Sequence, residues 1–426
     1  MKILIKNGRV IDPANKVDEA LDILVEDSKI AQVAKDIKAE AETVIDASAM
    51  IVMPGFVDMH VHLREPGRED KETVATGTRA ALAGGVTSVL AMPNTQPCPD
   101  STESVELIKN IVANCATCNV FVCGAITKGR KGEEIIDIAK LKKEGVIAIS
   151  DDGVSVDSDE LMLDAFKRAA KEKVVVICHS EDRKLSAGGV VNLGFTSTRM
   201  GLRGVSKESE FARVKRDIEL AQKTKAVVHI AHVSCKESVG IIAAAKKEGL
   251  KVTCETAPHY FALDESAVLG YDTNFKMNPP LRGKDDVKAV KEGLADGTID
   301  AIASDHAPHT ENEKEIEFER SEFGVIGLET ELSAAITELI ESGILKWKDL
   351  AEKFALNPAR ILRIDRGTLG IGAIADIVIF SPKKEWVVQK EKILSKSKNS
   401  PFLGKKLKGV VEYTICFGKI VYPFSK

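Results

Sequence analysis

Two histidines and an arginine occupy alternate positions in the stretch FVDMHVHLR, residues 56–64. In a β-strand, residues two apart point to the same side, so His60, His62 and Arg64 are expected to share one face. Imidazole nitrogens that face a core are costly to bury unless something binds them. The spacing therefore predicts a partner for the histidine pair, and a metal ion is one candidate.

Good metal ligands also follow several other short apolar runs. They are Asp151 and Asp152 after VIAIS, His179 in VVVICHS, His232 in AVVHIAHV and Asp305 in DAIASD. Any one alone would more often be a structural residue, but all of them occur where a strand is expected to end. Imidazole and carboxylate without thiolate favour zinc, with manganese, cobalt or iron as looser alternatives. Two ions bridged by a carboxylate and a hydroxide would supply a nucleophile at neutral pH, which predicts metal-assisted hydrolysis.

The remaining histidines are expected to have other roles. His229 lies an odd number of residues before His232, so it should face the opposite way and pack against a helix. His259, at the end of the seventh apolar run, is expected to be structural or to support a ligand. His306 is expected to tether a loop, and position alone leaves His309 open between substrate binding and structure.

Three polar side chains are candidates for recognising a substrate. Arg64 would continue the face of the histidines, where its guanidinium suits a carboxylate. Asn94 in MPNTQP could donate to an anion, and Asn278 lies in the Pro-rich segment KMNPPLR. A plain turn function is an equal alternative for both asparagines.

The pattern of elements explains how these residues could meet. From Phe56 onward, short β-branched runs alternate with segments of helical period, which is typical of parallel β/α units. Eight such runs within about 250 residues predict a TIM (β/α)8 barrel over residues 55–359, with its chemistry at the carboxyl ends of the strands. An open doubly wound sheet is the alternative, but no GxGxxG follows the first strand. The eight runs are FVDMHVH, VTSVLAM, NVFVCGA, VIAIS, VVVICHS, AVVHIAHV, KVTCET and DAIASD.

The two ends of the chain differ from its middle. Residues 1–54 and 360–426 contain short strand-like runs separated by turn residues. They are expected to pair into one small composite β domain, a β-sandwich built from both termini. The charged segment HTENEKEIEFERSEFG follows the last barrel strand, and its residues 311–322 fit either a solvated loop or a mobile lid.

Composition narrows the class of protein. The 426 residues are 44% hydrophobic and 29% charged, with a net charge of -4 and no basic stripe, which argues against nucleic acid as a partner. No apolar run reaches the ~18 residues of a membrane span, and the early polar start does not fit a secretory signal. A cytoplasmic enzyme is therefore expected, and eight scattered cysteines fit that compartment. The CxxC at Cys115 and Cys118, with Cys123 nearby, is weak evidence for zinc because it lacks a second pair.

Together the motifs resemble the amidohydrolase superfamily and, within it, the long bacterial type of dihydroorotase. DMHVHLREP and ASDHAPHTENEK match the two signatures of that family, and the other motifs follow in the expected order over nearly the whole chain: MPNTQP, SDDG, KMNPPLR, NPAR and SPFLGKKLKG. The resemblance implies that Asp305 is the catalytic base and that the metal ligands are His60, His62, Asp152, His179, His232 and Asp305. It implies substrate contacts from the side chains of His62, Arg64, Asn94, Asn278 and His309 and from the backbone of Phe323 and Gly324.

The resemblance also implies a reaction. This is the reversible zinc-dependent cyclisation of N-carbamoyl-L-aspartate to (S)-dihydroorotate in pyrimidine biosynthesis, with a metal-bound hydroxide as the nucleophile of the hydrolytic direction. One or two zinc ions are implied, two being favoured, with a homo-oligomer and room for an aspartate carbamoyltransferase partner.

One position separates this chain from several relatives. Hydantoinases, allantoinases and the shorter dihydroorotases bridge their metals with a carboxylated lysine, whereas VIAISDDG offers Asp152. The segment TAPHYFALDES varies within the family. The alternatives are another cyclic amidase and a catalytically silent subunit, and the complete ligand set argues against the second.

Overall fold

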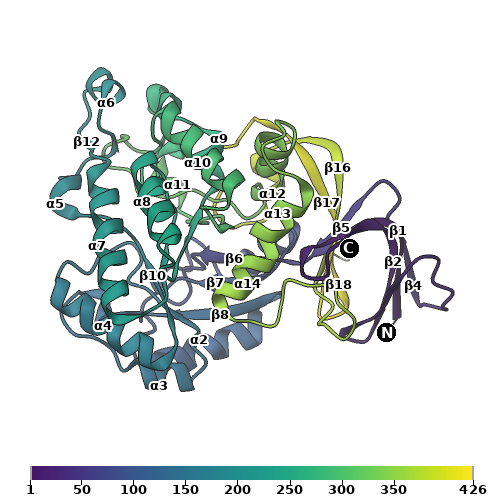
Figure 1. The fold of residues 1–426 in the computed structure, drawn as a ribbon. Coiled ribbons are helices and arrows are strands. Elements are labelled where there is room, and N and C mark those ends of the chain that lie inside the picture. The colour runs from purple at the N-terminus through teal and green to yellow at the C-terminus, as the bar shows by residue number, and fades with distance from the viewer. Residues whose placement is uncertain (1, 425–426) are drawn as a thin grey trace.

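Eight parallel strands form the centre of the structure, a computed structural model that describes residues 2–424. Each strand lies beside the one that precedes it in this set, which confirms the predicted (β/α)8 barrel (Figure 1). All eight predicted runs contain a strand, although several strands are shorter than predicted. The strands are β6 (Phe56–Val61), β7 (Val86–Ala91), β8 (Asn119–Gly124), β9 (Ala148–Ile149), β10 (Val175–Cys178), β13 (Val228–Ile230), β14 (Val252–Thr256) and β15 (Ala301–Ile302).

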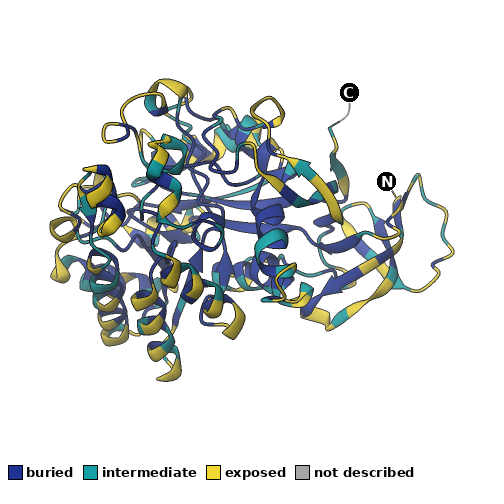
Figure 2. Cartoon of the chain, turned by 90° about the horizontal axis from the view of Figure 1, so that it is seen from above, coloured by how far each residue is buried: buried dark blue, intermediate teal, exposed yellow. Residues whose placement is uncertain are grey.

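Helices cover the outside of the barrel. Several of them begin at side-chain caps: Thr73 and Ser101, for example, accept hydrogen bonds from the backbone amides of Thr76 and Ser104. In Figure 2 the barrel strands are mostly dark blue, whereas the outer faces of the helices are yellow. The covering helices are α1 (Val74–Ala83), α2 (Thr102–Cys115), α3 (Ile138–Lys143), α4 (Asp159–Glu172), α7 (Glu208–Thr224), α8 (Lys236–Lys247), α10 (Lys284–Asp296), α12 (Glu331–Ala335), α13 (Trp347–Ala351) and α14 (Asn357–Leu362).

Alternation along the strands sorts apolar residues into two layers. On β10, Val176 and Cys178 belong to the core shared with the helices, whereas Val175 and Ile177 belong to the barrel interior. The interior cluster ends on α14, where Ala359 and Leu362 close one end of the barrel. Residues at the other end are therefore the ones free to form a site.

A carboxylate completes the barrel between its first and last strands. No strand ladder joins β6 to β15 in the described chain. Instead, Asp58 on β6 accepts hydrogen bonds from the backbone amides of Ser304 (3.1 Å) and His60 (3.0 Å). The amide of His62 then donates to the carbonyl of His306 (2.9 Å). These bonds fix the two histidine-bearing positions against the strand that leads to Asp305.

The two ends of the chain form one sheet beside the barrel. Its strands are hydrogen-bonded in the order β18-β17-β16-β5-β1-β2-β3, with β4 also paired to β1, so the composite β domain is a continuous sheet and not two separate ones. Its junction is the antiparallel pairing of β5 with β16. The predicted boundaries at residues 54 and 360 stay a proposal. The strands are β1 (Lys2–Asp12), β2 (Val17–Glu26), β3 (Lys29–Ala34), β4 (Thr43–Asp46), β5 (Ile51–Pro54), β16 (Ile377–Val387), β17 (Lys406–Cys416) and β18 (Lys419–Tyr422).

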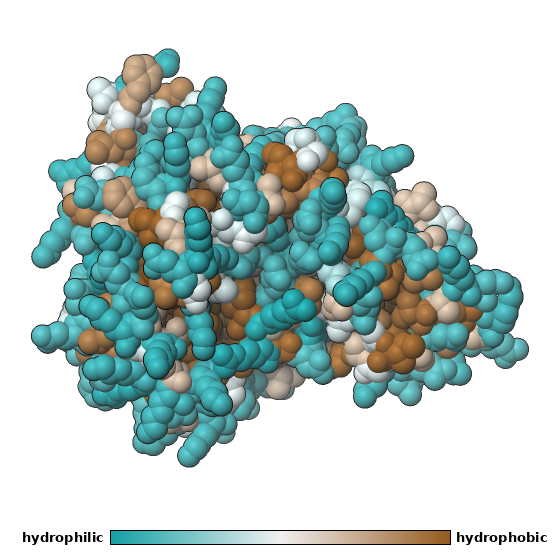
Figure 3. All heavy atoms as spheres, viewed as in Figure 1, coloured by the Kyte–Doolittle hydropathy of each residue, from teal (hydrophilic) through white to brown (hydrophobic). Residues whose placement is uncertain are grey.

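Short helices and strands lie at the rim of the barrel formed by the carboxyl ends of its strands. A protruding excursion after β10 contains α5 (Arg183–Ser186), β11 (Val191–Asn192), α6 (Phe195–Met200) and β12 (Gly204–Val205), and α9 (Pro258–Ala262) and α11 (Glu311–Lys314) follow β14 and β15. The face in Figure 3 is mostly hydrophilic, with separate hydrophobic areas over this excursion and over the terminal sheet. No helix among the described residues is long and apolar enough to cross a bilayer.

Candidate metal centre and active site

The two histidines of the first strand converge as predicted, but regular alternation is not the reason. His60 and His62 are 0% and 4% exposed, and their ring centroids lie 5.4 Å apart. However, Met59 also belongs to the barrel interior, and the ladder between β6 and β7 shifts register between Asp58 and Val61. This irregularity lets neighbouring residues of β6 face inward.

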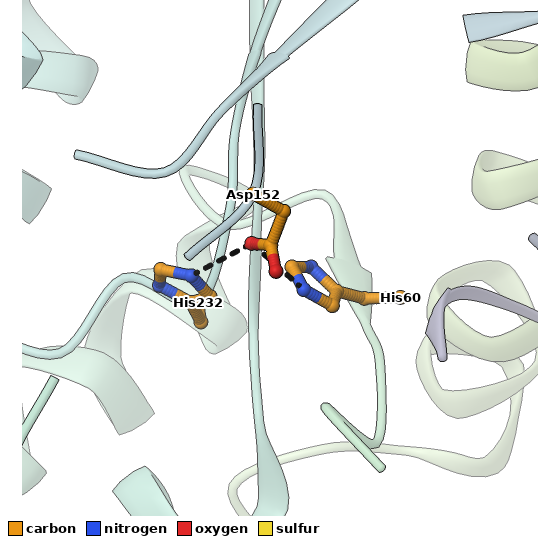
Figure 4. A group of neighbouring side chains, drawn as sticks. All are labelled: His60, Asp152 and His232. Atoms are coloured by element: carbon orange, nitrogen blue, oxygen red, sulfur yellow. Dashed lines mark ion pairs between the residues drawn. The ribbon is translucent and has the colours of Figure 1, made fainter. Parts of the chain in front are cut away.

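Asp152 lies at the centre of the imidazole cluster. Its Oδ1 is 3.3 Å from His60 Nε2, 3.5 Å from His179 Nδ1 and 3.8 Å from His232 Nε2. Its Oδ2 is 3.5 Å from His62 Nε2. Figure 4 shows the carboxylate between the rings of His60 and His232. Burial raises the pKa of Asp152, but the surrounding imidazoles outweigh burial and hold the pKa well below its usual range.

Asp305 approaches the same cluster from the last strand. Its Oδ1 is 3.4 Å from His62 Nε2 and 3.7 Å from His60 Nε2. Burial opposes ionisation, but His62 and the other imidazoles keep the pKa of Asp305 well below normal. Asp305 and His232 have φ values of 47° and 36°, in the left-handed region that ordinary residues rarely adopt. Backbone strain of this kind is concentrated at functional sites.

The donor set fits metal ions. At ligand distances of about 2.1 Å, two ligand atoms of a tetrahedral ion lie roughly 3.4 Å apart, close to the separations of 3.3–3.8 Å around Asp152 and Asp305. His60 Nε2 is buried and has no hydrogen-bond partner among the described residues. Two overlapping groups have ligand atoms within 4.8 Å of one another: His60, Asp152 and His232, and His60, His62 and Asp305. His60 belongs to both groups, but its single Nε2 lone pair can bind only one ion.

Hydrogen bonds to the Nδ1 atoms of His60 and His62 orient the two rings so that the Nε2 atoms face the cluster. His60 Nδ1 lies 2.8 Å from Glu255 Oε1, and His62 Nδ1 lies 2.9 Å from Asn94 Oδ1. Each oxygen accepts the Nδ1 proton, which leaves the Nε2 lone pair for a metal. Burial opposes ionisation of Glu255, but His229 and His60 lower its pKa to about 2, so it is an anion at neutral pH.

Glu255 and Glu181 were not among the predicted site residues. Glu181 Oε2 accepts a hydrogen bond from Asn278 Nδ2 (3.0 Å) and lies 3.4 Å from His179 Nε2. A possible signal for Glu255 was an acid on the inward face of the β-branched run KVTCET, where a charge needs a partner. Glu181 lies two residues beyond His179, and nothing else in the sequence marks it.

The prediction for His229 is wrong. Its Nε2 lies 3.3 Å from Glu255 Oε2 and its Nδ1 lies 2.8 Å from Thr253 Oγ1, both on β14, so it faces the barrel interior. Parity with His232 fails because β13 ends at Ile230 and the chain bends at His232. His229 therefore contacts and orients the Glu255 carboxylate, which in turn orients the His60 ring.

The other polar candidates have structural partners. Asp151 accepts hydrogen bonds from the amides of Ile126 and Thr127, so it anchors a loop while Asp152 alone faces the imidazoles. His306 tethers a loop as predicted, because the amide of Gly327 donates to its Nδ1. His259 packs against Tyr260, and burial lowers its pKa to about 4. The described cysteines belong to neither ligand group.

A cavity of about 330 Å³ opens above the imidazole cluster. Arg64 contributes to its wall, although β6 ends at Val61 and a φ of 61° at Arg64 breaks the strand face on which it was predicted. Its Nε donates to the carbonyl of Pro308 (3.2 Å) and its Nη2 is 3.3 Å from His309 Nε2. Burial lowers the pKa of Arg64 to about 10, so it stays cationic at neutral pH. The cavity also brings together the other predicted residues: His62, Asn94, Asp152, His179, His232, Asn278, Asp305, His309, Phe323 and Gly324.

Comparison with known proteins adds a family. A model described as dihydro-orotase-like matches residues 49–238. The chain is 52% identical over 420 residues to a dihydroorotase of Elusimicrobium minutum, covering 99% of this chain and 97% of that protein. It is 53% identical over 423 residues to a dihydroorotase of Geotalea daltonii, covering 99% of both.

Solved structures share the fold. An L-hydantoinase (dihydropyrimidinase) from Arthrobacter aurescens matches with a TM-score of 0.89 at 25% identity, over 98% of this chain and 95% of that one. A dihydropyrimidinase from Brevibacillus agri matches with a TM-score of 0.86 at 23% identity, over 99% and 95%, a likeness that shows the fold alone.

Proposed function

Because this chain belongs to the dihydroorotase family, a family of cyclic amide hydrolases, we propose that it interconverts N-carbamoyl-L-aspartate and (S)-dihydroorotate. Ring closure is the physiological direction, in pyrimidine biosynthesis. The observation that carries the proposal is one cavity with a buried imidazole–carboxylate cluster at its base and a half-buried arginine in its wall. A cyclic amide that bears a carboxylate matches both features.

The proposed metal ligands are the residues of that cluster: His60, His62, Asp152, His179, His232 and Asp305. Zinc, with two ions favoured over one, would polarise the amide carbonyl and lower the pKa of a water molecule toward ~7. Asp152 supports a paired site because its two carboxylate oxygens face different histidines.

Asp305 is the proposed general base and acid. Its carboxylate is ionised at rest and lines the cavity, so it can accept a proton from the attacking water. In the hydrolytic direction it then delivers that proton to the ring nitrogen as the amide bond breaks. In the direction of ring closure it takes the proton from the carbamoyl nitrogen instead.

The substrate carboxylate is proposed to bind Arg64, Asn94 and His309. Asn94 uses Oδ1 on His62, which leaves its amide protons for an anion. Burial and the cations at Arg64 and Lys71 lower the pKa of His309, so its neutral ring can contact the substrate. Asn278 and the backbone of Phe323 and Gly324 are proposed to hold the ring from the far side.

Hydantoin or dihydropyrimidine hydrolysis is the nearest alternative, because structures with those activities share the fold. Two residues favour a carboxylate-bearing substrate. Asp152 stands where the lysine-bridged relatives carry a lysine. The Arg64 cation in the cavity wall can pair directly with a carboxylate of the substrate but not with an uncharged ring.

The proposal extends to the setting of the enzyme. Eight free cysteines, most of them buried, support a reducing cytoplasm. A homo-oligomer and an optional aspartate carbamoyltransferase partner are proposed from the family alone. Light scattering of the purified chain with and without that transferase tests both.

The deciding experiment assays purified, zinc-loaded protein on dihydroorotate, hydantoin and dihydrouracil, with metal analysis of the same sample and no partner protein. We expect dihydroorotate to exceed the neutral rings by at least about 100-fold in kcat/KM, because only it pairs with Arg64. A preference for a neutral ring would overturn the assignment of the substrate. Inactivity on all three with full metal content would favour the silent subunit.

A further inference from the structure

Two buried lysines hold the segment that forms one side of the cavity. Residues 315–324, hereafter the wall segment, lead from α11 to Phe323 and Gly324. Lys276 and Lys314 are 2% and 4% exposed, and neither has a carboxylate within 4.0 Å among the ion pairs of the described chain. A buried ammonium group is costly unless its protons are bonded, so the partners of these two groups matter.

Backbone carbonyls of the wall segment are those partners. Lys276 Nζ donates to the carbonyls of Phe318 (2.8 Å), Glu319 (3.0 Å) and Ser321 (2.5 Å), which uses all three of its protons. Its ammonium group also lies 4.5 Å from the ring centroid of Phe323, within the range of a cation–π contact.

Lys314 completes the arrangement from the other side. Its Nζ donates to the carbonyls of Glu322 (2.8 Å), Gly324 (3.0 Å) and Lys276 (3.3 Å). The amide of Gly324 donates to the same carbonyl of Lys276 (3.0 Å). Five ammonium bonds and the backbone bond of Gly324 therefore converge on the wall segment, which has no strand ladder of its own.

The backbone at Gly324 is closely packed and has little room to move. At its φ of 136°, an added Cβ would lie 2.8 Å from Ala307 Cβ and 2.9 Å from the Ala307 carbonyl. Asn399 Nδ2 donates to the Gly324 carbonyl from the other side (3.1 Å). The position of this backbone at the cavity is thus set by contacts on several sides.

We infer that Lys276 and Lys314 are positioning residues, which order the wall segment from inside the chain and so complete the substrate cavity without a partner protein. This deepens the proposed function, since it assigns the order of the cavity wall to two side chains that do not touch the reacting atoms. Replacing either ammonium group by a methyl group removes three hydrogen bonds to backbone carbonyls and should loosen the wall segment.

The test uses the full-length, metal-loaded protein with Lys276→Met and Lys314→Met. Without substrate, we expect amide hydrogen exchange in residues 315–324 to accelerate at least about tenfold and trypsin to cleave faster after the exposed Arg320. With dihydroorotate, KM should rise about tenfold while kcat changes less than about threefold, because the wall loosens and the metal cluster does not.

Lys390→Met is the matched control. Lys390 also bonds to this region, through Glu311 of α11, but it is 46% exposed and its ion pair is on the surface. Such a pair contributes little, so exchange and KM should stay within about twofold of the original values. If the two buried variants behave like this control, the inference is wrong.

A milder variant covers the case in which the methionine variants do not fold. Thr273 Oγ1 donates to the carbonyl of Lys314 (2.5 Å), and Thr273→Val removes that bond while keeping both buried charges. This bond fixes the backbone from which the Lys314 side chain extends, so its loss should weaken the Lys314 ammonium bonds and speed exchange about threefold, confined to residues 310–324. Unchanged exchange would overturn the inference. Both exchange experiments are read without substrate, so an inactive wild-type protein would disprove the proposed function and leave this test intact.

Discussion

The floor of the cavity is built from strand ends, whereas its wall is built from loops. His60 and Asp152 extend from or directly follow barrel strands whose ladders fix the backbone. Arg64 and Gly324 lie on segments without a ladder. The Arg64 side chain donates to the distant carbonyl of Pro308, and the carbonyl of Gly324 accepts from the distant side chain of Asn399. We therefore expect the floor to set the metal and proton chemistry, and the wall to select the molecule that is presented to it. Changes in one region should leave the other largely intact.

The largest effect is expected in the floor. Asp305→Ala removes the proposed base and should lower kcat by about 10³–10⁴-fold, since general base catalysis typically contributes up to that range. Stopped assays of dihydroorotate hydrolysis measure the loss. Circular dichroism and exchange in residues 315–324 serve as controls and should match the original protein. A kcat within about tenfold of the original would remove Asp305 from the mechanism.

A change in the wall should separate two substrates. Arg64→Met should lower kcat/KM for dihydroorotate by about 10²–10³-fold, because truncating one member of a buried charge pair costs about 2–5 kcal/mol. The rate with a neutral cyclic imide should fall less than about tenfold, and bound zinc should be unchanged. Parallel assays of both substrates check this. Equal losses for the two would contradict a carboxylate role for Arg64.

A smaller effect is expected behind the floor. Glu255→Gln keeps an oxygen for His60 Nδ1 but removes the charge, so zinc should bind about 10–100-fold more weakly. Competition with a chromogenic chelator measures that affinity. Asp151→Asn provides the comparison, because Asp151 anchors a loop and does not face the cluster. Equal zinc affinity in the Glu255 and Asp151 variants would show that Glu255 does not support a ligand.

The smallest effect is expected on hydrogen exchange in the wall when the metal is removed, which tests whether floor and wall are independent. Removing zinc with a chelator should abolish turnover, and readdition should restore it. Exchange in residues 315–324 should change by less than about twofold, because the wall is held by Lys276 and Lys314 and not by the metal cluster. Mass spectrometry of the same peptides checks this. A wall segment that loosens on chelation would mean that floor and wall are one unit.

The sequence predicts the floor well, for a physical reason. Parallel strands bring their carboxyl ends to one rim, so ligand types at the ends of different runs must meet. The exceptions come from local backbone geometry that no residue pattern encodes. The register shift in β6 and the positive φ of His232 both change which way a side chain faces. Because of the bend at His232, the predicted orientation of His229 was wrong.

The wall is harder to predict because its contacts are long-range. The amide of His309 donates to Asn399 Oδ1, 90 residues away, and no period or spacing links the two. Phe323 and Gly324 entered the prediction through the family resemblance alone. Lys276 and Lys314 were missed because lysine is ordinarily exposed, and only the carbonyls around them show why these two are buried.

The sheet made from both chain ends has a consequence for synthesis on the ribosome. β5 is fully buried in the finished protein, but its partner β16 begins at Ile377, more than three hundred residues later. At about 5–20 residues per second, the edge of β5 stands open for roughly 15–65 seconds. During that time it offers unpaired amides and carbonyls to any neighbouring chain. The sequence separation of two strands that end up side by side thus sets how long this edge waits for its partner during synthesis.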